Sequence, residues 1–249
     1  MYSIGIDIGS TSAKAAVVED GKIAFTTVMP TGYNSVDAAD RLKEEIQSAG
    51  FEIGEDVGVV ATGYGRISVP YADKTVTEIT CHGRGASLLF GEDLTVIDIG
   101  GQDTKAVKIE NGTVSKFLMN DKCSAGTGKF LEIMANRLGV TLSELMDMAK
   151  KGEVTPISSM CTVFAESEVI SLIGKGTPRE NIARGVVDSV VTKVCSLVGR
   201  VGGEKYALTG GLCDEEFMVE SLKKALGAEV VTCSNARFAG AIGAALSAK

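Results

Sequence analysis

The chain has 249 residues, 45% of them hydrophobic, which permits one large domain or two small ones with a real core. A net charge of −7, with Lys and Arg scattered among Asp and Glu, argues against nucleic acid as a main partner. The sequence holds no apolar run of about 20 residues and no signal-peptide pattern, so we expect a cytoplasmic protein that does not enter a membrane.

The first predicted element is a set of three strands within residues 3–29. Asp7 closes the first apolar run and a Gly-containing polar turn follows it, while Asp20-Gly21 separates the second run from the third. Asp-Gly between two apolar runs is a strong hairpin signal. The segment therefore predicts a three-stranded antiparallel meander.

The same pattern returns at residues 94–119 without gaps. Asp98 lies 91 positions after Asp7. A lysine follows each aspartate by seven residues, at Lys14 and Lys105, and each turn glycine lies 14 residues after its aspartate. Two copies of one meander predict two similar α/β domains that face each other.

The turn after each aspartate is suited to phosphate binding. Asp7 and Asp98 end buried strands, where an unpaired carboxylate would be costly and a cation or its water shell would remove that cost. The glycines let the backbone approach a ligand closely, and turn N–H groups and hydroxyls can surround phosphate oxygens. The candidate nucleotide-binding residues of the two turns are Gly9, Ser10, Thr11, Ser12, Lys14, Gly100, Gly101 and Gln102.

A cysteine motif, "NDKCSAGTGKF", follows the second meander. It is not a Walker A loop, because Cys123 stands where the first glycine belongs and Phe130 where Ser or Thr belongs. Apolar residues at helical spacing begin at Phe130, with Ser124 or Asp121 as the expected N-cap and Gly139 as the expected end. Cys123 is therefore expected at the N-terminal end of a helix.

A second cysteine repeats this design. Cys161 precedes an apolar helical pattern that Gly174 and Gly176 end. The positive end of a helix dipole stabilises an anionic thiolate, and two such cysteines could form half of a soft-metal site. A four-iron cluster needs four thiolates, which a symmetric dimer would supply as two plus two. The alternative is that Cys123 and Cys161 are small buried hydrophobic residues.

The C-terminal third adds a further glycine turn. In "YALTGGLCDEEF" a strand is followed by Thr209, Gly210 and Gly211 and then by a helix, which gives a nucleotide another place to lie against backbone. A small-residue helix is expected at 237–248 and an amphipathic surface helix at 143–153.

Several other residues have two interpretations. Tyr64, in "ATGYGR", lies in a β–α turn or in an exposed docking loop for a partner protein. His82 is expected as a packed side chain more than as a ligand, because no second histidine exists to join it. Glu166 could orient a water or could be a solvated helix acid, and Cys195 is expected in a helix core.

The two DIG-type turns and the TGG turn resemble the phosphate-1, phosphate-2 and adenosine motifs of the superfamily of acetate and sugar kinases, heat-shock ATPases and actin. The resemblance implies an α/β fold of two similar actin-like (ribonuclease H-like) domains around an ATP cleft. The expected domains are residues 1–92 together with 234–249, and residues 93–233.

A closer resemblance runs over nearly the whole chain. "DIGSTSAK", "TGYGR", "CHGRGA", "DIGGQDTK", "NDKCSAGTGKFLE" and "SSMCTVFAESEVISL" resemble the BadF/BadG/BcrA/BcrD ATPase family, which includes activators of 2-hydroxyacyl-CoA dehydratases. The resemblance implies a homodimer in which Cys123 and Cys161 of both copies hold one [4Fe-4S] cluster. It also implies ATP and Mg²⁺, with Asp7 and Asp98 organising Mg²⁺ through water and Asp103 assisting the hydrolytic water.

The implied activity is ATP-driven transfer of single electrons. Ferredoxin or flavodoxin would load the cluster, and a partner iron–sulfur dehydratase or reductase would accept the electron. The family often has a Pro-Gln-like segment where this chain reads "TCSNARFAGAIGAA", so the adenine contacts near 235–238 stay open. The alternatives are a sugar-type kinase on the same fold, a reductase component for a double-cubane-cluster protein, or a regulatory ATPase without a cluster.

Overall fold

The computed structural model describes residues 1–91, 93–158 and 161–248. Residue 92, where we expect the first domain to end, lies outside the described residues, as do Ser159 and Met160 of the second cysteine motif and the last residue, Lys249. The strands are β1 (Tyr2–Ile8), β2 (Ser12–Glu19), β3 (Lys22–Pro30), β4 (Gly58–Thr62), β5 (Lys74–Thr75), β6 (Leu94–Ile99), β7 (Thr104–Glu110), β8 (Thr113–Asn120), β9 (Tyr206–Gly210) and β10 (Val230–Val231). The α-helices are α1 (Ser35–Ser48), α2 (Glu78–Phe90), α3 (Gly128–Leu138), α4 (Leu142–Lys151), α5 (Thr162–Gly174), α6 (Arg179–Val201), α7 (Glu216–Leu226) and α8 (Ala239–Ala245), and short 3₁₀ turns cover Arg66–Ser68 and Ala236–Phe238. None of these helices combines the length and the apolar character that crossing a membrane requires.

The strands form two five-stranded sheets with the same order. One reads β3-β2-β1-β4-β5, and the other, read in the matching direction, is β8-β7-β6-β9-β10. In the first sheet β2 is antiparallel to both β1 and β3, which confirms the meander predicted from residues 3–29. The central strand runs parallel to the next one in both sheets, β1 to β4 and β6 to β9. The structural repeat therefore includes all five strands of each sheet, and not only the three strands of each meander.

The two predicted hairpin turns have the same left-handed backbone. Asp20 and Gly21 have φ values of 48° and 78°, and Asn111 and Gly112 have 52° and 70°. A type I′ turn needs positive φ at both central residues, and Asp, Asn and Gly tolerate it best. This confirms that Asp-Gly and Asn-Gly are two-residue hairpin turns.

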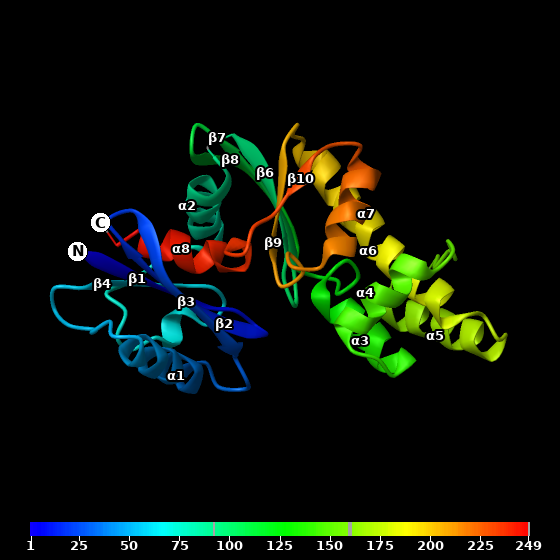
Figure 1. Ribbon diagram of the computed structural model, residues 1–249, viewed down its shortest axis with the longest axis horizontal. Helices are drawn as coiled ribbons and strands as arrows, with labels where there is room; N and C mark the ends of the chain where they lie inside the picture. Colours follow the sequence, from blue (N-terminus) through cyan, green and yellow to red (C-terminus); the bar gives the residue numbers. More distant parts are fainter. Residues whose placement is uncertain (92, 159–160, 249) are drawn as a thin grey trace. The chain divides into compact units, whose positions relative to one another are not determined.

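The chain divides into two compact units, which are residues 1–94, 108–116 and 234–249, and residues 95–107 and 117–233. In the first unit, α1 covers one face of the β1 sheet and α8 covers the other (Figure 1). A Cβ at Gly5 would lie 1.8 Å from the carbonyl oxygen of Ala241, so only glycine allows α8 to lie directly on β1. The helix predicted at 237–248 is shorter, because a 3₁₀ turn precedes α8 and Leu246 ends it.

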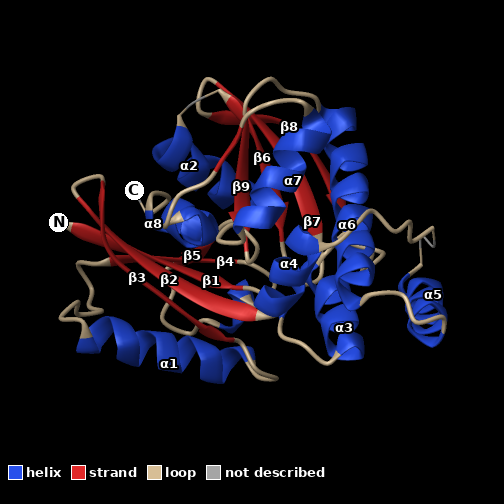
Figure 2. Cartoon of the chain, turned by 45° about the vertical axis from the view of Figure 1, so that its right-hand side comes forward, coloured by secondary structure: helices blue, strands red, loops and turns tan. Residues whose placement is uncertain are grey.

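In the second unit the helices α3, α4, α6 and α7 gather beside the β6 sheet, and α5 packs against α3 and α6 farther from it (Figure 2). The amphipathic helix predicted at 143–153 is confirmed as α4, which begins at a capping box formed by Thr141 and Glu144. It buries Leu145, Met146 and Ala149 and packs against the long helix α6.

Candidate functional site

The turn between β6 and β7 carries a buried cluster of charges. The Lys105 ammonium lies 2.7 Å from an Asp103 carboxylate oxygen and 3.3 Å from one of Asp98. All three residues are at most 4% exposed, and the Thr209 hydroxyl donates to the other Asp98 oxygen at 3.2 Å. The cluster has two negative charges and one positive charge. Burial at this depth is tolerated because each charge has an opposite partner.

This geometry corrects one step of the sequence argument. We expected the cost of burying an unpaired Asp98 carboxylate to be removed by a bound cation or its water shell. Lys105 already supplies a cation to Asp98, so burial of Asp98 alone does not require a metal ion. The sequence pattern located Lys105, but nothing in its spacing distinguished it from Lys14, which was the lysine we expected to bind nucleotide.

The β9 turn lies against the same aspartate. Gly210 has a φ of 84°, and a Cβ at this residue would lie 2.4 Å from the Ile99 carbonyl oxygen and 2.8 Å from an Asp98 carboxylate oxygen. Only glycine fits such a position. The Gly211 amide donates to the Ile99 carbonyl at 3.2 Å. The predicted TGG turn therefore packs directly against Asp98 and the backbone of Ile99.

The first unit holds the matching turn after β1. Asp7 is 4% exposed, and the Gly9 amide donates to the Ser12 carbonyl at 3.1 Å. Ser10 and Thr11 are exposed at its tip. In the second unit the Gly100 amide closes the same turn onto the Asp103 carbonyl at 2.9 Å, with Gln102 exposed.

The sequence reasoning missed a partner of the first turn. Gly63, which follows Thr62 as Gly210 follows Thr209, has a φ of 85°, and a Cβ there would lie 2.5 Å from an Asp7 carboxylate oxygen. The Gly65 amide donates to the Ile8 carbonyl, as Gly211 does to Ile99. The signal was present, because "VVATG" and "YALTG" each end an apolar run in Thr-Gly. Tyr64, between these glycines, is exposed, as expected for a loop.

Cys123 does not lie at a helix N-terminus. Helix α3 begins at Gly128 with Thr127 as N-cap and without a capping side chain, so the caps expected at Asp121 and Ser124 are wrong. The reason is that backbone carbonyls replace the cap: the Gly128 amide donates to Gly100 and the Lys129 amide to Gly101, both at 2.9 Å. Cys123 is instead exposed in the loop before α3.

Cys161 lies where the sequence predicts. It is the N-cap of α5, it is exposed, and its carbonyl accepts the Ala165 amide at 2.9 Å. The residues that follow the two cysteines are in contact, because the Ser124 and Thr162 hydroxyls are hydrogen-bonded at 2.7 Å. The fold thus brings together two loops that are 38 residues apart in sequence, each carrying an exposed cysteine.

The remaining candidates have structural partners. Glu166 on α5 forms an ion pair with Arg137 on α3, and Glu168 accepts the amide and hydroxyl of Ser158. His82 is buried within α2, which agrees with a packed side chain. Cys195 on α6 is half-buried, so it belongs to the edge of the helix core and not to its centre.

The two exposed cysteines fit half of a thiolate metal site. A [4Fe-4S] cluster is held by four thiolates, and the two hydrogen-bonded loops each carry one exposed cysteine. The buried Cys81 is unsuited to this role, because it is not accessible from the surface and desolvation by burial raises its pKa to about 11. Of these three cysteines, Cys123 and Cys161 are therefore the ones accessible to a metal centre at the surface.

Residues 4–248 match the model of one protein family, and this covers both turns and both cysteine loops. The chain belongs to the BadF/BadG/BcrA/BcrD ATPase family. It is 44% identical to the (R)-2-hydroxyglutaryl-CoA dehydratase activating ATPase of Acidaminococcus fermentans, over 100% of this chain and 97% of that protein. It is 43% identical to the activator of lactoyl-CoA dehydratase of Anaerotignum propionicum, with the same coverage.

The ATPase-family fold is also found in a similar solved structure. The activator of the 2-hydroxyisocaproyl-CoA dehydratase from Clostridium difficile, with bound ADPNP, matches with a TM-score of 0.92 and 39% identity, over 100% of this chain and 94% of that one. The predicted fold class, α/β with the actin-like ATPase fold, is confirmed by this match and by the two equivalent sheets.

Proposed function

We propose that this protein is an ATP-dependent activator that delivers single electrons to a partner iron–sulfur enzyme of the 2-hydroxyacyl-CoA dehydratase class. Two relatives that cover the full chain are named as activators of such dehydratases, and a third, also an activator, binds an ATP analogue. Family membership supports ATP hydrolysis, and the paired cysteine loops support a redox role.

In this proposal ATP binds between two domains, residues 1–92 with 234–249 and residues 93–233. The DIG-type turns contact the phosphates through the candidate residues given above, and the TGG turn contacts the nucleoside through Gly210 and Gly211. Asp7 and Asp98 would hold Mg²⁺ through water. Asp103, fixed by Lys105, orients the hydrolytic water, since its position in the buried cluster leaves it little freedom.

Cys123 and Cys161 of two chains would hold one [4Fe-4S] cluster, which supplies a one-electron carrier when bound. The observation that carries this proposal is the Ser124–Thr162 contact, because it places both exposed cysteine loops at one surface. Helix α5 beside them supports a homodimer. Four of its large apolar side chains are exposed by 43% to 68%, and a second copy would cover them: Val163, Phe164, Ile170 and Ile173.

The electron donor and the electron acceptor are assigned by their chemistry. A ferredoxin or a flavodoxin reloads the activator with one electron. The acceptor is a dehydratase whose own iron–sulfur centre needs a lower potential than the donor provides unaided, and ATP hydrolysis supplies the difference.

The test is anaerobic purification followed by iron analysis and single-cysteine substitution. We expect a brown protein with about four irons per dimer. Cys123→Ser and Cys161→Ser should each lose the iron and the electron delivery, whereas the matched controls Cys195→Ser and Cys233→Ser should keep both. Iron content that is unchanged in either ligand variant would contradict the proposal. A colourless protein that phosphorylates a sugar would favour the kinase alternative.

A further inference from the structure

Helix α3 begins on the backbone of the β6–β7 turn. The first amides of a helix have no partner within it, and here two of them donate to the turn: Gly128 to Gly100 and Lys129 to Gly101, each at 2.9 Å. A Cβ at Gly128 would lie 3.2 Å from the Gly100 oxygen, so the approach is close. The proposed phosphate-binding turn and the start of α3 therefore move as one piece.

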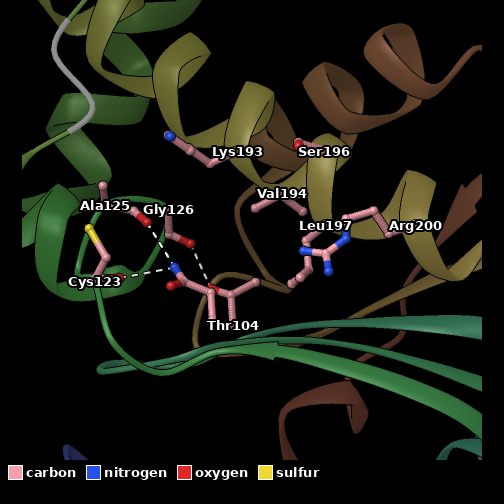
Figure 3. A pocket seen from close by; sticks show the side chains of 10 residues that line it. Thr104, Cys123, Ala125, Gly126, Lys193, Val194, Ser196, Leu197 and Arg200 are labelled. Carbon is pink, nitrogen blue, oxygen red and sulfur yellow. Dashed lines mark hydrogen bonds between the residues drawn. The ribbon is translucent and has the colours of Figure 1, made fainter.

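A side chain adds a third connection between the turn and the cysteine loop. The Thr104 hydroxyl, 2% exposed, donates to the Gly126 carbonyl at 2.6 Å (Figure 3). Gly126 has a φ of 89°, and a Cβ there would lie 2.9 Å from the Cβ of Lys193 on α6. The loop is thus held between Thr104 on β7 and helix α6, with little space to move independently of either.

The connection continues from Gly126 to both cysteines. The Asn120 amide group donates to the carbonyls of Cys123 and Ala125 at 2.9 and 3.0 Å. The Thr127 hydroxyl donates to the Ser124 carbonyl at 2.6 Å, and Ser124 in turn contacts Thr162 beside Cys161. A shift at Gly126 would consequently reach the Cys123 loop directly and the Cys161 loop through Ser124.

The first copy of the repeat lacks this connection. Ala13 occupies the position 91 residues before Thr104 and has no hydroxyl to donate. In that copy the carbonyl of Gly9, the equivalent of Gly100, accepts the hydroxyl of Thr31 just after β3 at 2.8 Å. A hydroxyl contact from the strand after the DIG-type turn is therefore present in the copy that carries the Cys123 loop and absent at the equivalent residue of the first copy.

We propose that Thr104 is a positioning residue that transmits the nucleotide-dependent position of the Gly100–Gly101 turn to the Cys123 loop. This rests on the proposed function in one respect, that nucleotide phosphates bind at this turn. Without the hydroxyl, the turn would still hold the start of α3 through backbone bonds, but Gly126 and the residues before it would no longer follow it.

The experiment compares hydrogen exchange of residues 120–128 in the full-length anaerobic protein with ADP and with a non-hydrolysable ATP analogue. We expect the wild-type exchange rates to differ between the two nucleotides, and Thr104→Val to reduce that difference by about tenfold, the factor that one net hydrogen bond is worth. Thr104→Ser, which keeps the hydroxyl, should retain the difference. Iron release to a chelator, measured with the same nucleotides, should follow the same order of variants.

Thr95→Val is the matched control. The Thr95 hydroxyl also donates from a strand to a glycine carbonyl, that of Gly202 at 2.7 Å, and Thr95 is completely buried. This variant should keep the nucleotide-dependent difference. Thr104→Ala, which copies Ala13 of the first repeat, serves if the valine variant does not fold.

Three results would overturn the inference: a full wild-type difference in both Thr104→Val and Thr104→Ala, an equal loss in Thr95→Val, or no nucleotide dependence in the wild-type loop. Each is measured on backbone amides and needs no iron. A wild-type protein without iron would instead overturn the proposed function and leave the exchange test intact.

Discussion

The two copies of the strand repeat share a backbone and differ in the charges they bury. Both close the DIG-type turn with an amide–carbonyl bond, from Gly9 to Ser12 and from Gly100 to Asp103. In the second copy Lys105 is buried between two aspartates, whereas in the first Lys14 is half-buried and Ser12 replaces the second aspartate. The two copies therefore share the turn geometry, and the second copy has a buried lysine between two aspartates where the first does not.

The copies also differ in the connection after the third strand. From β3 the chain passes through residues 31–57, with the single helix α1, to the next strand of the sheet. From β8 it passes through residues 121–205, which include both exposed cysteines and helices α3 to α6. Since the sheets keep the same order, the redox features we propose were added in one connection without changing the sheet.

The largest expected effect tests the buried charges. Lys105→Met removes the only cation of the cluster and leaves two carboxylates in a buried site, so it should lower the free energy of unfolding by about 3–5 kcal/mol. Lys14→Met should cost about 1 kcal/mol or less, because within the described residues Lys14 forms no ion pair. Urea unfolding of the two variants measures this comparison.

The double variant Lys105→Met/Asp103→Asn is the control for charge. It restores the original balance of one net negative charge, and we expect it to regain about 1–2 kcal/mol relative to Lys105→Met. If Lys105→Met cost no more than Lys14→Met, the two copies would not differ in the way described.

The second largest effect tests a feature that both copies share, the positive-φ glycine that follows Thr62 and Thr209. Gly210→Ala and Gly63→Ala each place a Cβ within 2.5 Å of a backbone carbonyl oxygen at positive φ, and each should cost about 2–3 kcal/mol of stability. Gly211→Ala is the matched control, because a Cβ there meets nothing within 4 Å. In thermal unfolding, the melting temperatures of Gly210→Ala and Gly63→Ala should both lie well below that of Gly211→Ala. Unequal losses at the two positions would show that the turns are not equivalent.

The comparison also shows what sequence can predict. The strands, their hairpin turns and the repeat were predictable because apolar runs, Asp-Gly or Asn-Gly turns and regular spacing can be read directly from the sequence. The repeat predicted two similar domains, whereas the positions of β4 and β9 beside the central strands came from the structure. The glycine after each Thr was equally readable from "VVATG" and "YALTG".

The start of α3 and the role of Thr104 were not predictable in this way. Local capping rules favoured Ser124 or Asp121, but the amides of Gly128 and Lys129 are satisfied by carbonyls 28 residues earlier in the chain. Likewise, nothing near Thr104 in sequence indicates that its hydroxyl meets Gly126. Such hydrogen bonds depend on how separate elements pack, which periodicity does not encode.

The third effect in size is a pH dependence of stability, which we expect to be stronger in the first unit than in the second. Burial raises the pKa of Cys81 in the first unit to about 11, from an ordinary value near 9. Between these values the unfolded chain loses this proton and the folded chain keeps it, so the stability contributed by Cys81 is present below pH 9 and falls as the pH rises towards 11. The loss should reach about 2 kcal/mol near pH 11, and Cys81→Ala should remove it.

Cys195 in the second unit provides the matched comparison. Burial also raises its pKa, but the side chain is only half-buried, so Cys195→Ala should flatten the pH profile of stability less than Cys81→Ala does. The measurement is urea unfolding of wild type and both variants from pH 8 to pH 11. A profile that is equally steep in wild type and Cys81→Ala would contradict the assignment.

The smallest expected effect lies where the copies diverge. Asn120 ends β8 and holds the Cys123 and Ala125 carbonyls, whereas the equivalent residue of the first copy is Met29, which has no amide group. Asn120→Ala should cost only about 1 kcal/mol of global stability, since the side chain is half-buried and water can replace part of its hydrogen bonding. It should nevertheless speed hydrogen exchange in residues 121–126, because local opening of the loop no longer breaks these two bonds.

Met29→Ala, the control, should leave that exchange unchanged while also lowering global stability, because Met29 packs against the β1 core. If both variants altered exchange in the cysteine loop alike, the loop would respond to overall stability and not to the Asn120 contacts.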